Sequence, residues 1–438
     1  MAGDSKDVAR AHLADAGVEE LPDDWDVVTL GDLFTEDRGI AVGVMYPGDH
    51  DPDGVPLIKA GDLNGSIINP QPDFRISKNK HHEYRRTALE GGELLMTLVG
   101  NVGQCAVVPS RMAGWNTARA VAVMRLADSS ETHFVQQCLL SRPLQHLMDV
   151  WCNTTVQATL NLKEIRQLPL PWPPKKSRDA IAAFGKALDD KIELNRRMNA
   201  TLEAMARALF QSWFVDFDPV RAKLDGRQPE GMDEATAALF PSHFDHKTEG
   251  VIPTGWLATT LGEVIEIFDS KRIPLSGRER EARQGKFPYH GAASVMDYVD
   301  DFLFDGIYLL MGEDGSVINE DGTPVLQYVW GKFWVNNHAH VLRGKNGIST
   351  EHLLLHLKGC NISPFVTGAV QPKLNQGNMN RVPFMLAPPE IGQAFAKAIE
   401  PLFAQIRANT EQSRTLAALR DTLLPKLLSG EITPTGTS

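Results

Sequence analysis

The stretch LPDDWDVVTLGDLF at residues 21–34 returns in altered form as IPTGWLATTLGEVI at residues 252–265. The alignment matches Pro22 with Pro253, Trp25 with Trp256, Leu30 with Leu261 and Gly31 with Gly262, at a constant offset of 231 in the numbering. An internal repeat of this kind constrains the architecture before any helix or strand is assigned. The chain is therefore expected to contain two related halves.

A second repeat closes each half. VQATLNLKEIRQLPLP at 156–171 matches VQPKLNQGNMNRVPFM at 370–385, at an offset of 214 in the numbering. Because the two offsets differ by 17, the interior of the first half is about 17 residues longer than that of the second. The interiors share little visible similarity, so we expect one frame that holds two different inserts.

A long helical pattern follows each closing stretch, after the prolines of PLPWPPKK at 169–176 and of LAPPE at 386–390. Proline is common at the start of a helix. A heptad repeat runs through Ile181, Leu188, Asn195, Leu202 and Leu209, with Phe184, Lys191, Met198 and Met205 in the companion positions. It returns with the same offset of 214 at Phe395, Leu402, Asn409, Leu416 and Leu423.

An apolar stripe of this kind also occurs on ordinary core-facing helices, but two matching stripes favour pairing of the helices as an antiparallel coiled coil. The first helix is predicted over about 177–212, a rod on the order of 50 Å long. Asn195 and Asn409 occupy equivalent core positions. We predict that their amides meet at a pseudo-twofold axis and fix the helix register; the alternative is that each faces outward at a local irregularity.

The composition indicates an ordinary globular protein of two to four domains, with 438 residues, 42% hydrophobic and 23% charged. The net charge of -11 argues against coating nucleic acid by bulk attraction, although a local basic surface is compatible with it. No apolar run reaches the length of a membrane span, and the polar N-terminal segment at 1–20 lacks the apolar core of a signal peptide, so we expect a cytoplasmic protein.

Two stretches of the second half contain candidate binding residues. DSKRIPLSGREREARQGKFPYHG at 269–291 has six basic and three acidic residues, and its glycine and proline predict a loop that is either a solvated surface or a binding segment. In YVWGKFWVNNHAHVL at 328–342, Asn336, His338 and His340 would share one face if the segment were a single strand.

Three interpretations of His338 and His340 are open: they clamp a metal, they find local polar partners, or they read a ligand. A zinc site needs three or four protein ligands, and no cysteine or second histidine pair stands at ligand spacing elsewhere. Cys105, Cys138, Cys152 and Cys360 form no CxxC pair, which favours reduced structural thiols. We therefore expect no metal and no cofactor.

In combination, several stretches give the chain a family resemblance. They are TVQATLNLKEIRQLPLPWPP, KIELNRRMNATLEAMARALFQSWFVDFDPV, FPYHGAASVMDYVDDFLFDGIYLLMGEDG, the YVWGKFWVNNHAHVL segment and the terminal LRDTLLPKLLSGEI. Over nearly its whole length the chain resembles a DNA-specificity subunit of a type I restriction-modification system. The resemblance implies an α+β fold with two α/β target-recognition domains, separated by two long antiparallel helices that form a pseudo-twofold coiled coil.

What the resemblance implies about function is also specific. Each target-recognition domain reads half of a split sequence in double-stranded DNA, and the helices dock two methyltransferase subunits, through which restriction and translocase subunits act. We expect an N-terminal polar or helical segment at 1–20, a first recognition domain at 21–172, a central helix and linker at 173–250, a second recognition domain at 251–387 and a C-terminal helix at 388–438.

The residues favour binding without catalysis. An adenine methyltransferase needs an (N/D)PP(Y/F) motif and a glycine-rich loop for its methyl donor, and FDPV at 217–220 is not that motif. No Walker GxxxxGK(S/T) motif is present. Alternatives are a subunit of a two-component system whose partner both methylates and cleaves, a metal-dependent hydrolase using His338 and His340, and a scaffold that joins two protein-binding domains.

Candidate DNA-binding residues follow from side-chain chemistry, because Asn can pair with adenine, Arg and Lys with guanine, and basic loops with phosphates. In the second half they are Lys271, Arg272, Arg278, Arg280, Arg283, Tyr289, His290, Asn336, Asn337, His338 and His340. In the first half they are Lys59, Asn64, Lys78, Asn79, Lys80, His81, Arg85 and Arg86.

Overall fold

The computed structural model describes residues 2–36, 39–152, 158–248, 250–368 and 370–433. The beginning of the first closing stretch, at 156 and 157, lies outside this description. The chain folds into two compact units. Unit 1 comprises residues 1–197 and 410–438, and unit 2 comprises residues 198–409. Among the helices of the described residues, none has both the length and the apolar character needed to cross a membrane.

The opening and closing repeats of unit 1 pair with each other. Strand β1 (Asp26–Thr29) lies antiparallel to β11 (Pro169–Trp172), with Asp26 opposite Trp172. The turn of 3-10 helix that follows, η1 (Leu30–Leu33), contacts α5 (Leu162–Gln167) of the closing repeat. The two ends of the first insert are thereby brought to one place.

Unit 2 repeats this ribbon with the predicted offsets. Strand β14 (Leu257–Thr260) lies antiparallel to β23 (Pro383–Leu386), with Leu257 opposite Leu386. Leu257 corresponds to Asp26 at the offset of 231, and Leu386 corresponds to Trp172 at the offset of 214. The shared frame expected from the repeats is therefore a two-stranded ribbon in each unit.

The first insert forms two main sheets. The larger has the strand order β2 (Ile40–Val42), β10 (Val121–Met124), β7 (Leu94–Thr97) and β8 (Cys105–Val107). The smaller has the order β6 (Arg75–Ile76), β3 (Val55–Ile58) and β9 (Asn116–Thr117), and a short hairpin joins β4 (Leu63–Asn64) to β5 (Ile67–Ile68). Strands β3 and β9 are parallel, whereas the other pairs named here are antiparallel.

The second insert repeats this strand order and has one additional strand in its second sheet. Its first sheet has the order β15 (Ile265–Ile267), β22 (Ala339–Gly344), β19 (Tyr308–Gly312) and β20 (Leu326–Val329). Its second has the order β17 (Val295–Val299), β16 (Gln284–His290), β21 (Lys332–Val335) and β18 (Phe304–Asp305), with β16 parallel to β21. The two inserts therefore differ in sequence, as expected, and share the order of their main strands.

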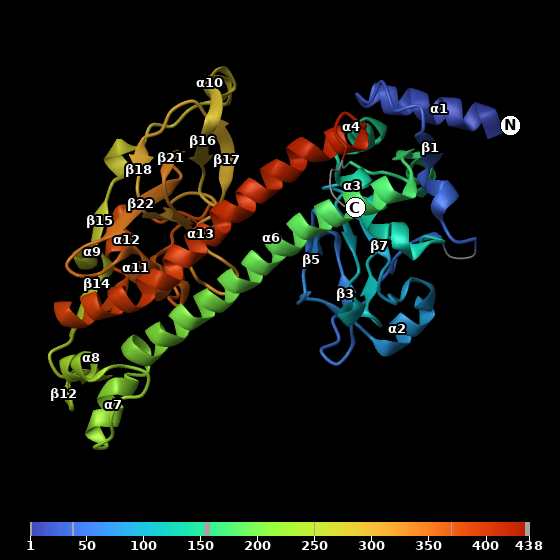
Figure 1. Cartoon of the computed structure of the whole chain (residues 1–438). Helices are drawn as coiled ribbons and strands as arrows, with labels where there is room; N and C mark the ends of the chain where they lie inside the picture. Colours follow the sequence, from blue (N-terminus) through green and yellow to red (C-terminus); the bar gives the residue numbers. More distant parts are fainter. Residues whose placement is uncertain (1, 37–38, 153–157, 249, 369, 434–438) are drawn as a thin grey trace. The chain divides into compact units, whose positions relative to one another are not determined.

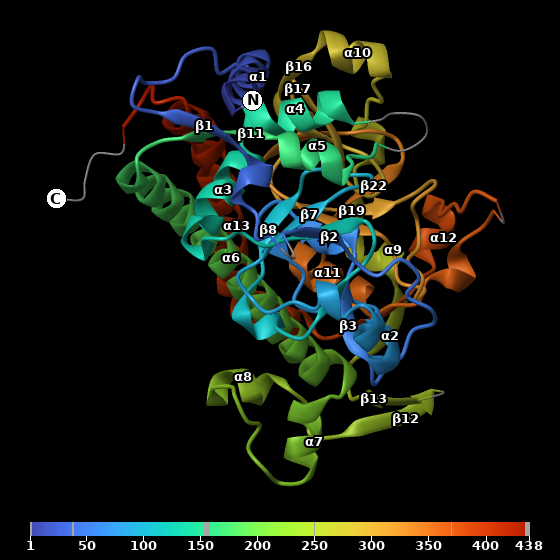
Figure 2. The same cartoon turned by 90° about the vertical axis from the view of Figure 1, so that its right-hand side faces the viewer.

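Each unit also contains several short helices. Unit 1 contains α1 (Ala2–Asp15), α2 (Lys78–Glu83), α3 (Thr132–Leu140), α4 (Arg142–Trp151) and α5. Unit 2 contains α7 (Asp218–Leu224), α8 (Glu234–Leu239), α9 (Leu261–Val264), α10 (Gly277–Ala282), α11 (Thr350–Lys358) and α12 (Gln376–Asn380). In unit 2, α7 and α8 lie together with the hairpin of β12 (Phe244–Thr248) and β13 (Gly250–Pro253) (Figures 1 and 2). Helix α1 is not merely polar, because Ala9 and Leu13 are buried in the core of unit 1.

Two long helices begin where the prolines predict. They are α6 (Lys175–Phe210), green in Figure 1, and α13 (Pro389–Leu428), red in Figure 1. Helix α6 continues into a π-helical turn, η6 (Gln211–Val215). Their heptad stripes bury Ile181, Asn195, Phe395 and Asn409, but Met198 and Met205 are exposed, so the predicted companion positions are wrong there. Those methionines lie off the seam because an α-helix turns by 3.6 rather than 3.5 residues.

Within unit 1 the two helices run antiparallel. Asn195 Nδ2 donates to Gln412 Oε1 at 2.9 Å and to Ser413 Oγ at 3.2 Å. Arg420 Nη1 donates to Asp189 Oδ1 at 2.7 Å. Residues with lower numbers on α6 therefore contact residues with higher numbers on α13, as the predicted antiparallel coiled coil requires.

Unit 2 repeats this arrangement. Asn409 Nδ2 donates to Asn199 Oδ1 at 2.9 Å, and the ring centroids of Phe210 and Phe395 lie 6.2 Å apart. Asn199 and Ser413 are separated by the same offset of 214 that relates Asn195 to Asn409. The Asn195–Ser413 and Asn409–Asn199 contacts are thus equivalent, as the predicted pseudo-twofold relation requires. A direct bond between Asn195 and Asn409 would join the two units and stays a prediction.

Candidate nucleic-acid interface

A three-residue turn occupies the same place in both units. It joins β9 to β10 in unit 1, as residues 118–120 (turn 1), and β21 to β22 in unit 2, as residues 336–338 (turn 2). The two turns correspond because Ala118 N–H donates to the Ile58 carbonyl at 2.8 Å, whereas Asn336 N–H donates to the His290 carbonyl at 3.0 Å. Residues 328–342 are therefore not the single strand considered from the sequence, because they comprise the end of β20, β21, turn 2 and the start of β22.

The turns present unlike side chains. Asn337 and His338 are exposed in turn 2, whereas Asn336 is buried and its Oδ1 accepts the His338 N–H at 2.8 Å. In turn 1 the exposed residue is Arg119. Sequence reasoning missed Arg119, because the sequence TARAVAVM has no local signal that distinguishes a turn arginine from one on a strand. Only the equivalence with turn 2 singles it out.

His338 and His340 do not share a face. The side chain of His338 is 47% exposed, whereas that of His340 is 0% exposed. His340 Nδ1 lies 2.6 Å from Asp269 Oδ2, and its Nε2 lies 2.7 Å from the Leu374 carbonyl oxygen. Because both ring nitrogens face acceptors, both donate, and the ring is an imidazolium. The interpretation of local polar partners is correct for His340.

The surroundings shift the pKa values of this pair in opposite directions. Burial alone would lower the pKa of His340, but the hydrogen bond and charge of Asp269 more than offset it and raise that pKa. Burial alone would raise the pKa of Asp269, but hydrogen bonds from His340, Val341 N–H and Gln376 lower it. Both groups are therefore held in their charged forms.

A metal ion does not fit this place well, although Asp269, Glu313 and His340 offer ligand atoms within 4.8 Å of one another. The guanidinium of Arg272 already supplies the cation, with Nη1 2.5 Å from Glu313 Oε2 and Nη2 3.4 Å from Asp269 Oδ2. His340 Nε2 is also turned to a backbone carbonyl, away from any shared ion. The two histidines therefore do not form the metal clamp considered from the sequence.

The basic run at 269–291 is more ordered than the predicted loop, since it contains α10 and β16. Several of its arginines are paired with carboxylates. Arg280 Nε lies 3.1 Å from Asp297, Arg283 Nη2 lies 2.9 Å from Asp300, and Arg272 joins Asp269 and Glu313. Lys271 and Arg278 are exposed. The charge that this segment can offer to a phosphate is therefore concentrated in fewer residues than the sequence suggests.

Two further candidates of unit 2 are buried. Tyr289 Oη accepts the Leu275 N–H at 2.9 Å, and His290 Nδ1 lies 2.9 Å from Gln327 Oε1. Both lie on β16, where it pairs with the strand that leads into turn 2. Their position suits support of the turn rather than reading of a base edge.

The unit 1 candidates gather mainly around α2 and the turn of 3-10 helix after it, η3 (Arg85–Thr87). Lys78, Asn79, Arg85 and Arg86 are exposed there, and Asn64 is exposed on β4. Lys80 pairs with Glu83 at 2.7 Å and Lys59 with Asp73 at 2.9 Å. His81 lies 3.4 Å from Asn116, and burial lowers its pKa. The candidates on α2 and η3 thus lie together in one basic segment, whereas Lys59 follows β3 and Asn64 lies on β4.

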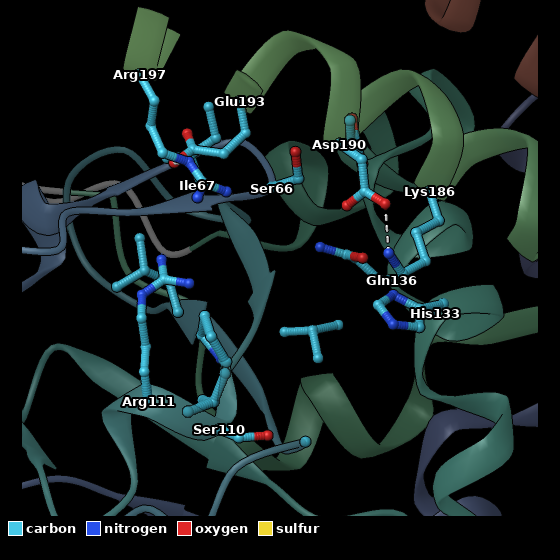
Figure 3. A pocket seen from close by; sticks show the side chains of 16 residues that line it. Ser66, Ile67, Ser110, Arg111, His133, Gln136, Lys186, Asp190, Glu193 and Arg197 are labelled. Carbon is cyan, nitrogen blue, oxygen red and sulfur yellow. Dashed lines mark hydrogen bonds and ion pairs between the residues drawn. The ribbon is translucent and has the colours of Figure 1, made fainter. Parts of the chain in front are cut away.

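A pocket of about 410 Å³ also lies in unit 1, between strands β5 and β8 and helix α6 (Figure 3). The guanidinium groups of Arg111 and Arg197 point toward one another on one side, and Lys186 pairs with Asp190 on the other. The lining also contains Asp189 and Glu193 beside these groups, so acidic and basic side chains are balanced. This balance does not favour a polyanion such as DNA.

The two matching units agree with a comparison against known families. The family model described as "Type I restriction modification DNA specificity domain" matches residues 22–204 and 253–417, one match for each half. The chain belongs to this family. The resemblance seen in the sequence is thereby confirmed, as is the expected fold class.

Individual relatives are distant. A putative type I restriction enzyme specificity subunit of Haemophilus influenzae is 33% identical over 144 residues, which are 33% of this chain and 36% of that protein. The MjaIX specificity subunit of Methanocaldococcus jannaschii is 22% identical over 442 aligned residues, 95% of each chain. The crystal structure of a type I S subunit from M. genitalium has a TM-score of 0.50 at 16% identity, covering 92% of this chain and 96% of that one. The last likeness shows the fold alone.

Proposed function

We propose that this specificity-family chain is a non-catalytic subunit that reads a split, asymmetric sequence in double-stranded DNA. The observation that supports it best is the pair of equivalent turns. Two units of one topology present Arg119 in turn 1 and Asn337 with His338 in turn 2, so each unit has the same reading geometry and a different chemistry. Unlike readers related by a pseudo-twofold axis require unlike half-sites.

Residues 21–172 and 251–387 are the proposed target-recognition domains. Segments 173–250 and 388–438 supply the helices that separate them, and segment 1–20 adds α1 to the first. The proposed DNA contacts are the exposed candidates and one addition, Arg119. They are Asn64, Lys78, Asn79, Arg85, Arg86 and Arg119 in unit 1, and Lys271, Arg278, Asn337 and His338 in unit 2.

The proposed protein partners are two methyltransferase subunits, which in turn bring restriction and translocase subunits in the cytoplasm. Exposed apolar side chains at equivalent helix positions support two docking places. Met205 on α6 is 50% exposed in unit 2, and Leu419, its equivalent on α13 by the repeat of the heptad stripe, is 43% exposed in unit 1. Surface apolar side chains repeated by the pseudo-symmetry favour the same partner at each place.

A two-component system, in which one partner both methylates and cleaves, fits the chain equally well and is distinguished by the partner's own activities. The hydrolase alternative has less support, because the imidazoles of His338 and His340 do not converge. The protein scaffold alternative explains the duplicated frame but not the unlike polar turns.

The test uses the full-length chain with and without its methyltransferase subunit. We expect methyl transfer to DNA by the complex and none by the purified chain, because the chain lacks methyl-donor and adenine-binding motifs. Mapping of methylated bases in the host genome should give one split sequence with unlike halves. Methyl transfer by the chain alone, or a palindromic target, would contradict the proposal.

A further inference from the structure

Four charged side chains form a cluster beside turn 2, here called the turn-2 network: Asp269 and His340, which are buried, and Arg272 and Glu313, which are partly buried. Asp269 joins His340 at 2.6 Å and Arg272 at 3.4 Å, while Glu313 joins Arg272 at 2.5 Å and lies 3.6 Å from His340. Two cations thus alternate with two anions. The side chain of Arg272, which the sequence suggests as a phosphate contact, is only 11% exposed.

The network is bonded to the backbone of the turn and its exit strand. Arg272 Nη1 donates to the carbonyl oxygens of Ala339 at 2.7 Å and of Asn337 at 3.5 Å. The N–H of Glu313 donates to the His338 carbonyl at 2.8 Å. Asp269 Oδ1 accepts the N–H of Val341 at 2.9 Å. The four network residues therefore bond to the main chain of residues 337, 338, 339 and 341. His340 belongs to the network through its ring.

Unit 1 builds the same four-stranded sheet with apolar residues at the places of Asp269, Glu313 and His340. Counting from the matched turns, Ala122 stands at the place of His340 and pairs with Val42 and Met96. When the β15–β22 pairing is continued by two residues, Asp269 lies opposite His340, just as Val42 lies opposite Ala122. Met311 lies opposite His340 as Met96 lies opposite Ala122, so Leu98 corresponds to Glu313. Apolar residues are thus sufficient for this topology.

A buried ionic cluster is often less stabilising than apolar side chains of similar volume, because its charges lose hydration. Since unit 1 shows that the fold does not need such a cluster, a stabilising role alone does not explain its presence in unit 2. The cluster adds directed hydrogen bonds, because its donors and acceptors are fixed opposite the carbonyl and amide groups of turn 2 and its exit strand.

We propose that the turn-2 network positions Asn337 and His338 for reading one half of the DNA target, and that Arg272 acts through the turn rather than by touching DNA. This inference rests on the proposed function. Side chains that pair with base edges must be held to about 0.5 Å. In turn 2 the network adds hydrogen bonds to the main chain beyond those of the flanking strands.

The test compares Arg272→Gln and Glu313→Gln in the full-length chain bound to its methyltransferase subunit. Each complex selects duplexes from a randomised pool, and base preference is scored separately for the two halves of the selected site. Selection of a split site by the wild-type complex tests the proposed function by itself. If it fails there, the function is wrong; if it succeeds and the variants behave like wild type, only the network inference is wrong.

Both variants are expected to lose base preference in the same half, by roughly tenfold, the discrimination of about one base pair. The other half should be unchanged. Binding to random duplex should keep its affinity and salt dependence, since no phosphate contact is removed. The two substitutions change the charge in opposite directions, so a shared loss in one half cannot be an effect of net charge.

Arg278→Gln is the matched control, because it removes the same charge from an exposed position of the same segment. It should weaken binding to all duplexes and leave the preference of each half intact. If Arg272→Gln behaves like Arg278→Gln while Glu313→Gln tightens binding, Arg272 is a phosphate contact and the proposal is wrong. Loss in both halves would also refute it.

A second variant covers the case in which Arg272→Gln does not fold, as judged by thermal unfolding. Arg272→Lys keeps the charge but not the planar fork that reaches Glu313 and two carbonyls together. A positioning role predicts that Arg272→Lys also loses preference in one half. A phosphate contact predicts that lysine restores wild-type behaviour, which would overturn the inference.

Discussion

Neutralising Lys271 and Arg278 together should flatten the salt dependence of DNA binding by a defined amount. The sequence groups them with Arg272, Arg280 and Arg283 as one basic set, for which about one unit of slope is expected per lost phosphate contact. The structure divides the set, because those three arginines are paired with carboxylates of unit 2. Lys271 and Arg278 are the exposed members.

The magnitude follows from counterion release. Each phosphate contact contributes a slope of about 0.9 in log K against log salt, so two contacts contribute about 1.8. Between roughly 50 and 200 mM salt, a fourfold change, the wild-type complex should therefore lose about twelvefold more affinity than the Lys271→Gln/Arg278→Gln double variant. Fluorescence anisotropy of a labelled duplex at several salt concentrations measures both slopes directly.

Arg280→Gln is the control for this experiment. Its guanidinium lies beside Asp297 and donates to the Leu275 carbonyl at 2.8 Å, so it should contribute to local stability and not to the slope. The loss of stability should be small, because solvent screens a partly exposed ion pair. An unchanged slope in the double variant, or an equal reduction in Arg280→Gln, would refute the division of the set.

Three further predictions concern modularity, register and pH. Exchanging residues 35–155 for the insert of a relative should change one half of the recognised sequence, as read by methylation mapping; a change in both halves would contradict separate reading units. Replacing Asn195 and Asn409 by leucine should raise the midpoint of thermal unfolding, by roughly 2–4 °C per kcal/mol gained, and blur discrimination of spacer length in binding assays. Sharper discrimination would argue against a register role. Burial lowers the pKa of His352 to about 3 from an ordinary value of 6.5, so only the unfolded chain takes up this proton between those values. Stability should therefore fall as the pH drops below about 6.5, by about 2 kcal/mol at pH 5, and His352→Leu should remove that loss in denaturant titrations; an unchanged pH profile would show that His352 is protonated in the fold.

The sequence by itself determined the repeat and the long helices. The two offsets, 231 and 214, are visible in the chain and reappear as the ribbons β1–β11 and β14–β23. Helix starts are local features, set by a few residues such as the prolines before α6 and α13, and these could be located closely. The heptad stripe gave the antiparallel pairing, although it placed Met205 on the seam from which the helix geometry turns it away.

Only the tertiary structure decided that the two unlike inserts share one topology and where the charged residues lie. A strand pairing such as Tyr289 with Trp334 joins two distant parts of the insert, and nothing in either local sequence names its partner. Arg272 has the side chain of a phosphate contact, yet it is mostly buried and paired with Glu313, which follows a distant strand. Exposure and ion pairing arise from such non-local contacts, whereas composition and periodicity depend on neighbouring residues alone. The repeated frame could therefore be predicted from the sequence, and the proposed DNA-binding surface could not.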